Sequence, residues 1–190
     1  MNNRAIINTD RLKKILKYVS TLNNANQITM MFKFSFQGLR LCNWYRLQLK
    51  DIIDGNNEIV EMIHLQGDKN KGGKKVIYYL NDELRKDLKE YIKGWDLNNK
   101  ERYLFVSYKT GRPYQKNSLT NLFHKIYNDM GIENCSTHCG RRNFITNLLV
   151  NGVDITTVKE LVGHSFIQTT ALYYNTNESM LKNVVNKNKI

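Results

Sequence analysis

The sequence predicts an α+β fold that is mainly helical and contains a small antiparallel β-sheet. Apolar residues recur at helical spacing through most of the chain. Between residues 53 and 80 the pattern changes to two short runs rich in β-branched and aromatic residues, separated by the polar segment GDKNKGG. With 190 residues and no linker, repeat or low-complexity block, we expect residues 1–190 to form a single domain.

The first half of the chain is predicted to contain two helices and a hairpin. TDRLKKILKYV (residues 9–19) has Thr9 or Asp10 as its N-cap and apolar residues at helical spacing. A second helix opens at Arg40, with Leu39, Trp44 and Leu47 as core residues. NEIVEMIHLQ (residues 57–66) and KKVIYYL (residues 74–80) then form a β-hairpin with lysines and glycines at its tip.

The second half is predicted to be helical. Asn81 caps a helix in residues 81–95, and a helix in residues 117–131 stops at Gly131. Further helices are predicted in residues 140–152, 154–164, 165–175 and 178–188.

The charge of the chain indicates a polyanionic partner. Lys and Arg number 29 against 17 Asp and Glu, which gives a formal charge of +12. The basic residues do not form one amphipathic helix with a bulky apolar face, so nucleic acid is favoured over a membrane surface. No apolar run is long enough for a transmembrane span. Three cysteines without framework spacing indicate reduced thiols, and we expect a cytoplasmic protein.

Several polar residues could bind an anion, although each alone has an ordinary structural explanation. In STHCGRRNF, His138 and Arg141 are three residues apart and would share one face of a helix. His164 follows Gly163 at the end of a short helix, where it could equally cap a turn. Arg40 could equally form a salt bridge. The hairpin tip could equally be a solvated loop; its lysines are Lys69, Lys71, Lys74 and Lys75.

Taken together, these segments resemble the catalytic domain of the tyrosine recombinase, or phage integrase, family. They occur in the order GLR, KGGKK, HCGR, LVGH and HSFIQTTALY, and the last of these has a tyrosine nine residues after its histidine. The similarity is most specific from Thr137 to Tyr173. It implies a helical fold of the DNA breaking-rejoining type and the catalytic residues Arg40, Lys71, His138, Arg141, His164 and Tyr173.

The resemblance leaves some positions open. Lys71 precedes Gly72 and fits the family's hairpin lysine best, with Lys69 as its competitor. Asn43 stands where the family usually has Glu, Arg142 where a second His is common, and Tyr79 where Pro is frequent. The remaining basic residues of these segments are expected to contact DNA: Lys69, Lys74, Lys75 and Arg142.

The resemblance also implies a reaction. Tyr173 would attack a DNA phosphodiester and form a covalent 3′-phosphotyrosine, so that strands are rejoined without ATP or metal. The implied partners are double-stranded DNA and three further protomers in a tetramer, and the implied setting is a mobile element. A DNA-binding accessory protein without strand exchange and a topoisomerase-like relaxase are the alternatives.

Three further expectations concern segments near the motifs. Residues 1–190 would form the catalytic domain alone, without the N-terminal core-binding domain of the family. The stripe in residues 176–190 would dock on a neighbouring protomer or fold back on its own core, and consists of Met180, Leu181, Val184 and Val185. The spacing of Cys135 and Cys139 is not that of a structural zinc site, so we expect no metal.

Of the adjacent tyrosines Tyr173 and Tyr174, only Tyr173 has the spacing that the family gives its nucleophile. Tyr174 would point about 100° away on a helix and would be a packing residue.

Overall fold

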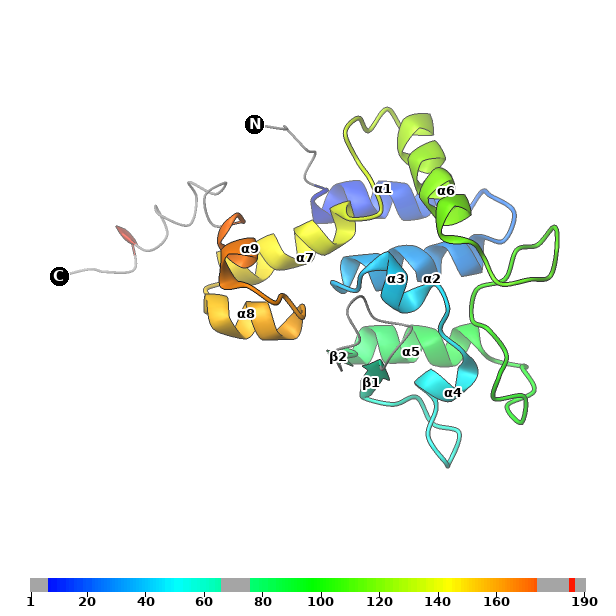
Figure 1. Ribbon diagram of the computed structural model, residues 1–190. Coiled ribbons are helices and arrows are strands. Elements are labelled where there is room, and N and C mark those ends of the chain that lie inside the picture. Colours follow the sequence, from blue (N-terminus) through cyan, green and yellow to red (C-terminus); the bar gives the residue numbers. More distant parts are fainter. Residues whose placement is uncertain (1–6, 66–75, 174–184, 187–190) are drawn as a thin grey trace.

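The computed structural model describes residues 7–65, 76–173 and 185–186, and it consists mainly of helices with one two-stranded sheet (Figure 1). The predicted fold class is confirmed. The elements are α1 (Thr9–Val19), α2 (Ala25–Phe36), α3 (Leu41–Trp44), α4 (Leu49–Ile52), β1 (Met62–Leu65), β2 (Val76–Tyr79), α5 (Asp82–Tyr91), α6 (Lys116–Asp129), α7 (Cys139–Val150), α8 (Ile155–Leu161) and α9 (Ile167–Ala171).

The strands β1 and β2 form the predicted antiparallel hairpin. Met62 pairs with Tyr79 and Ile63 with Tyr78. Ile63 and Tyr78 are buried, whereas Met62 and Tyr79 are exposed, because successive side chains on a strand point to opposite faces. The hairpin tip, with all four of its predicted lysines, lies outside the described residues.

The helices predicted in residues 9–19, 81–95, 117–131, 140–152, 154–164 and 165–175 are present, with one corrected cap, whereas most of the helix predicted in residues 178–188 lies outside the described residues. Asn8, rather than Thr9 or Asp10, caps α1: its side chain accepts a hydrogen bond from the Arg11 N–H at 2.9 Å. Thr9 is already helical, whereas Asn8 has the extended backbone that a cap requires. At α5 the predicted cap is confirmed, because Asn81 Oδ1 accepts from the Leu84 N–H at 2.9 Å.

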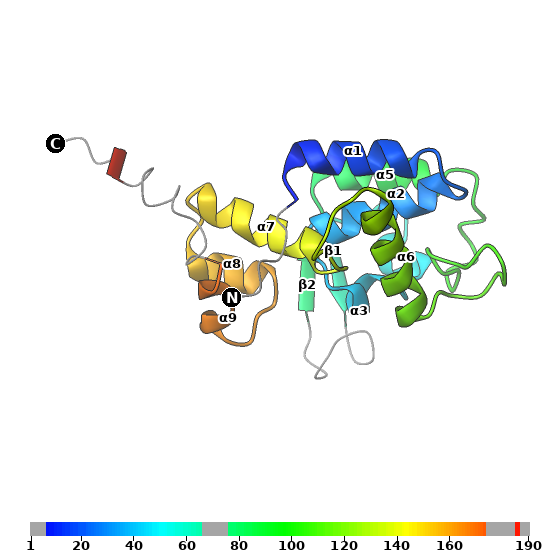
Figure 2. The same cartoon turned by 90° about the horizontal axis from the view of Figure 1, so that it is seen from above.

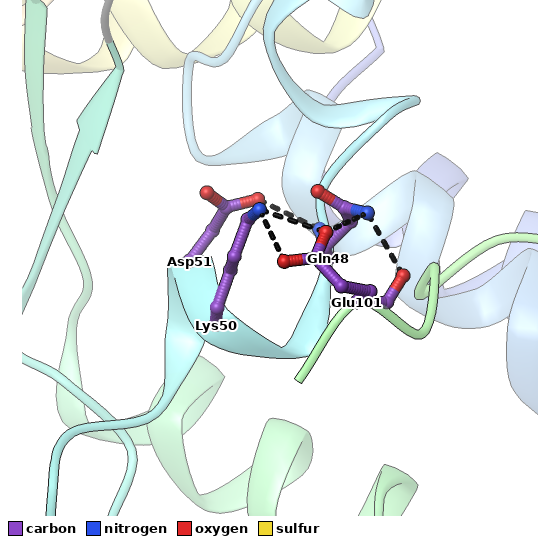
Figure 3. A network of polar contacts seen from close by, with 4 residues as sticks. All are labelled: Gln48, Lys50, Asp51 and Glu101. Atoms are coloured by element: carbon purple, nitrogen blue, oxygen red, sulfur yellow. Dashed lines mark hydrogen bonds and ion pairs between the residues drawn. The ribbon is translucent and has the colours of Figure 1, made fainter. Parts of the chain in front are cut away.

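The region around Arg40 differs from the prediction of one continuous helix. It contains two short helices, α3 and α4, because the chain becomes extended at Gln48 and forms an isolated bridge with Tyr103. Figure 3 shows the polar contacts that stabilise this break. The Gln48 N–H donates to Asp51 Oδ2 at 2.7 Å, and Gln48 Nε2 donates to the backbone oxygen of Glu101 at 2.8 Å. Lys50 Nζ completes the network on Glu101 Oε1 at 2.7 Å.

Helix α2 is not predicted by the sequence pattern, although it lies at the centre of the fold. Half of its twelve residues are buried, namely Ile28, Met30, Met31, Phe32, Phe34 and Ser35, and at 100° per residue they cover more than half of its circumference. The amphipathic signal is correspondingly weak, because only a narrow polar face remains. Helices α1, α5 and α7 all pack against it.

Two clusters of buried side chains make up the core. The larger cluster contains residues from each of the helices α1–α6 and from both strands. The smaller cluster consists of Ile145, Leu149, Val158 and Val162, from α7 to the end of α8. Helix α7 links them: it runs from the α1–α6 body to α8 and α9, as both views show (Figures 1 and 2). None of the helices in the described ranges is long and apolar enough to cross a membrane.

Candidate active site

Two arginines from distant parts of the sequence meet at the turn between α8 and α9. Arg40 directly precedes α3, and its Nη2 donates to the Gly163 carbonyl at 3.1 Å. Arg141 lies in the first turn of α7, where Nη2 donates to the Val162 carbonyl and Nη1 to the Gly38 carbonyl. These backbone acceptors fix both guanidinium groups beside one another.

Gly163 allows this turn to come close to the arginines. Its φ is +62°, a left-handed conformation that favours glycine. A Cβ atom at this position would lie 3.2 Å from Val76 Cγ1 and 3.9 Å from Arg40 Nη1. The absence of a side chain at Gly163 therefore lets Val76 of β2 pack closely against the turn, while the distance to Arg40 is an ordinary van der Waals contact.

His164 follows in the same turn, with 8% of its surface exposed. Burial, and then the charges of Arg141 and Arg40, lower the pKa of His164 from 6.5 to about 4. The imidazole is therefore neutral at physiological pH.

Tyr173 lies just after α9 and completes the cluster. Its ring stacks on that of His164, with the centroids 6.4 Å apart and the planes 18° from parallel. It also interacts electrostatically with Arg141 and packs against the smaller core cluster. Helix α9 ends at Ala171, earlier than the predicted end at residue 175, and Tyr174 lies outside the described residues.

The site is strongly positive. Among the described residues, neither Arg40 nor Arg141 forms an ion pair with a carboxylate. Burial, and then the charge of Arg40, lower the pKa of Arg141 to about 10, so the Arg141 guanidinium group stays protonated at neutral pH. Two adjacent cations with donors to spare are suited to binding a phosphate.

Sequence reasoning missed Tyr78, which supports the site from β2. Its hydroxyl donates to Asn43 Oδ1 at 3.0 Å, and both residues are buried. Tyr78 also partly offsets the lowering of the Arg141 pKa by burial and by Arg40. The acceptor of the Tyr78 hydroxyl, Asn43, is a neutral amide at the position where the family usually has a carboxylate. A strand tyrosine is an ordinary core residue in sequence, so only the contact between segments shows this role.

The contacts above join four of the six predicted catalytic residues: Arg40, Arg141, His164 and Tyr173. His138 lies exposed at the N-cap of α7, where its N–H donates to Ser136 Oγ at 3.3 Å. Lys71 lies outside the described residues, as do the predicted DNA contacts Lys69, Lys74 and Lys75.

Arg142, the remaining predicted DNA contact, lies half-buried on α7 near two cysteines. A hydrogen bond between the two thiols is the largest influence on both: it raises the pKa of Cys135 and lowers the pKa of Cys139 to about 6. The charge of Arg142 is a smaller influence, which counteracts the rise at Cys135 and adds to the lowering at Cys139. In the part of the chain that the structure describes, no group of three or more His, Cys, Asp or Glu residues could hold a metal ion.

Known proteins are similar to this chain over most of its length. The model of the phage integrase family matches residues 6–180. The chain belongs to the phage integrase family. Relatives include the TnP I resolvase of Bacillus thuringiensis, 30% identical over 175 residues, which cover 90% of this chain and 57% of the relative. Tyrosine recombinase XerD of Rickettsia prowazekii is 27% identical over 188 residues, which cover 93% and 60%.

Solved structures of this family share the fold. The XerA recombinase crystal structure superposes with a TM-score of 0.75 at 21% identity, covering 100% of this chain and 66% of that one. XerH bound to its palindromic difH substrate gives a TM-score of 0.70 at 22% identity, covering 95% and 52%. The chain spans 57–60% of the length of the two curated relatives named above.

Proposed function

We propose that this chain is the catalytic domain of a site-specific DNA recombinase or integrase that cuts and rejoins strands through a 3′-phosphotyrosine. The observation that carries the proposal is the cluster of Arg40, Arg141, His164 and Tyr173 around the α8–α9 turn. It combines a nucleophile with cations suited to a phosphodiester. Membership of the phage integrase family supports the same reaction.

In the proposed reaction, the Tyr173 oxygen attacks phosphorus as the bond to the deoxyribose 5′-oxygen breaks. A phenol with a pKa near 10 ionises at pH 7 at a cost of about 4 kcal/mol. The nearby guanidinium groups bind the charge that develops on the non-bridging oxygens. His164 donates a hydrogen bond to the same phosphate, and His138 either accepts the phenol proton or orients the phosphate.

The leaving 5′-oxygen needs a proton, which we assign to Lys71 of the hairpin, with Lys69 as the alternative. The phosphotyrosine is itself a phosphodiester, so the cleavage step consumes no phosphodiester bond overall. A 5′-hydroxyl of another strand can therefore attack it and rejoin DNA without ATP.

The proposed partner is double-stranded DNA, held in a tetramer of protomers. Lys69, Lys74, Lys75 and Arg142 would contact it. Residues 176–190 would dock between protomers; of these, Val185 and Asn186 are described and helical, and Val185 is 71% exposed. Retention of the bound DNA should fall steeply with salt, because each phosphate contact releases counterions.

A trapping experiment tests the proposal. The full chain is incubated with nicked suicide duplexes that tile the DNA flanking its coding region, and covalent complexes are resolved on denaturing gels. Wild-type protein should form a complex and Tyr173→Phe should not. Tyr108→Phe is the matched control, because Tyr108 is 79% exposed. Salt-dependent binding without any covalent complex would instead indicate a DNA-binding accessory protein.

We also infer a cytoplasmic location. Cys42, Cys135 and Cys139 are all free thiols, as is usual in a reducing compartment. Recovery of the protein from a periplasmic or extracellular fraction would contradict this inference.

A further inference from the structure

A buried hydrogen bond joins the turn of His164 to the helix that leads to Tyr173. Thr170 Oγ1 lies 2.9 Å from His164 Nδ1. Thr170 is fully buried in α9, and it is not one of the residues that the family resemblance identifies. We propose that Thr170 is a positioning residue that donates to Nδ1 and so holds His164 as the tautomer with its proton on Nε2.

The direction of this hydrogen bond follows from the partners available. Within the described residues, the Thr170 hydroxyl makes one hydrogen bond, the one with His164. If Nδ1 carried the proton, Nδ1 would be the donor, and the hydroxyl hydrogen would be left buried without an acceptor among the residues that the structure describes. Such an unsatisfied donor is costly. The arrangement that satisfies both groups has the hydroxyl donating and Nδ1 accepting.

The charges around His164 keep Nδ1 able to accept. Arg141 from α7 and Arg40 from the segment before α3 both disfavour a positive imidazole, as does burial. The Tyr173 ring covers the imidazole from the end of α9. None of these groups is a carboxylate that would stabilise a protonated ring.

This arrangement leaves Nε2–H as the hydrogen-bond donor of His164. Here the inference rests on the proposed function, because the acceptor would be a non-bridging oxygen of the DNA phosphate. A neutral donor fixed before DNA arrives needs no reorientation during the reaction.

The same contact couples His164 to the nucleophile. Thr170 and Tyr173 are linked by a hydrogen bond from the Tyr173 N–H to the Thr170 carbonyl at 3.0 Å. One residue of α9 therefore holds the histidine through its side chain and the tyrosine segment through its backbone. Movement of this turn shifts both catalytic groups together.

The tautomer can be measured without DNA. In the full chain with ¹⁵N-labelled histidine, two-bond proton–nitrogen spectra report which ring nitrogen is protonated, and His164→Gln assigns the His164 signals among the four histidines. Wild-type protein should show protonated Nε2 and bare Nδ1 from pH 6 to pH 8. Thr170→Ser should preserve this state, and Thr170→Val should give a mixture of tautomers. Protonated Nδ1 in the wild-type protein would overturn the proposal.

The reaction gives a second readout in the suicide-duplex assay described above. Thr170→Val should slow covalent complex formation by about 10- to 100-fold, approaching the effect of losing a transition-state donor, and Thr170→Ser should restore most of the rate. An unchanged rate in a folded Thr170→Val protein would refute the positioning role. If the wild-type protein forms no covalent complex, the proposed function fails, while the nitrogen spectra still decide the hydrogen bond.

Discussion

The substitution Gly140→Ala tests how closely α7 must approach α2 for the site to form. Gly140 is buried and lies between His138 and Arg141 in the sequence. A Cβ atom at this position would lie 2.5 Å from Ser35 Oγ, 2.7 Å from Phe36 Cδ2 and 2.8 Å from the Ser35 carbonyl carbon. One of these contacts is with the backbone of α2, so rotation of a side chain cannot relieve all of them.

The size of the effect follows from these distances. Carbon atoms in contact lie about 3.5–4.0 Å apart, so α7 must move by about 1 Å. Overpacking of this kind costs about 1–3 kcal/mol of stability. Arg141 lies one residue further along α7, and its two backbone hydrogen bonds define its position. A shift of about 1 Å in a reacting group can reduce a rate by about 100-fold.

Two measurements check this prediction. Urea unfolding should show the stability loss, and the suicide-duplex assay should show slower formation of the covalent complex at a temperature where the variant is folded. Gly55→Ala is the matched control: no atom lies within 4 Å of its added Cβ, and its φ is not positive, so it should leave both unchanged. Wild-type stability and rate in Gly140→Ala would show that α7 does not need this close approach.

Three other predictions concern stability. Because the pKa of His164 is about 4 in the folded chain and 6.5 otherwise, the unfolded state binds more protons as pH falls, and unfolding free energy should drop by about 2 kcal/mol from pH 7 to pH 5. In His164→Gln the unfolding free energy should depend less on pH by this amount; the same pH dependence as in the wild-type protein would contradict the pKa shift. Asp154 caps α8, so Asp154→Ala should lower Tm by roughly 2–4 °C while Asp154→Asn should not, as calorimetry can test. Tyr78→Phe removes the buried bond to Asn43 and should cost about 1 kcal/mol in urea unfolding; no loss would show that the bond contributes nothing.

The sequence predicted those elements whose stabilising residues are close together in the chain. Helices α1 and α5 each have one apolar face and a polar cap, so spacing alone identifies them. Helix α2 lacks this signal because it is buried on most sides. The break before α4 was missed because Gln48 is held extended by partners near residue 101, far along the chain.

The candidate site divides in the same way. The order and spacing of the motifs indicated Arg40, Arg141, His164 and Tyr173, and the structure brings these four together. The residues that hold them carry no local signal: Tyr78 acts across segments, and a Thr in a short helix has no distinctive pattern.

The most direct test of the proposed reaction is to identify the amino acid that becomes linked to DNA. The complex trapped on a suicide duplex is digested with nuclease and protease, and the nucleotide-bearing peptide is sequenced by mass spectrometry. The nucleotide is predicted on the Tyr173 oxygen, and Tyr174→Phe should leave the yield of complex unchanged. A nucleotide on Tyr174 or on any other residue would contradict the assignment of Tyr173 as the nucleophile.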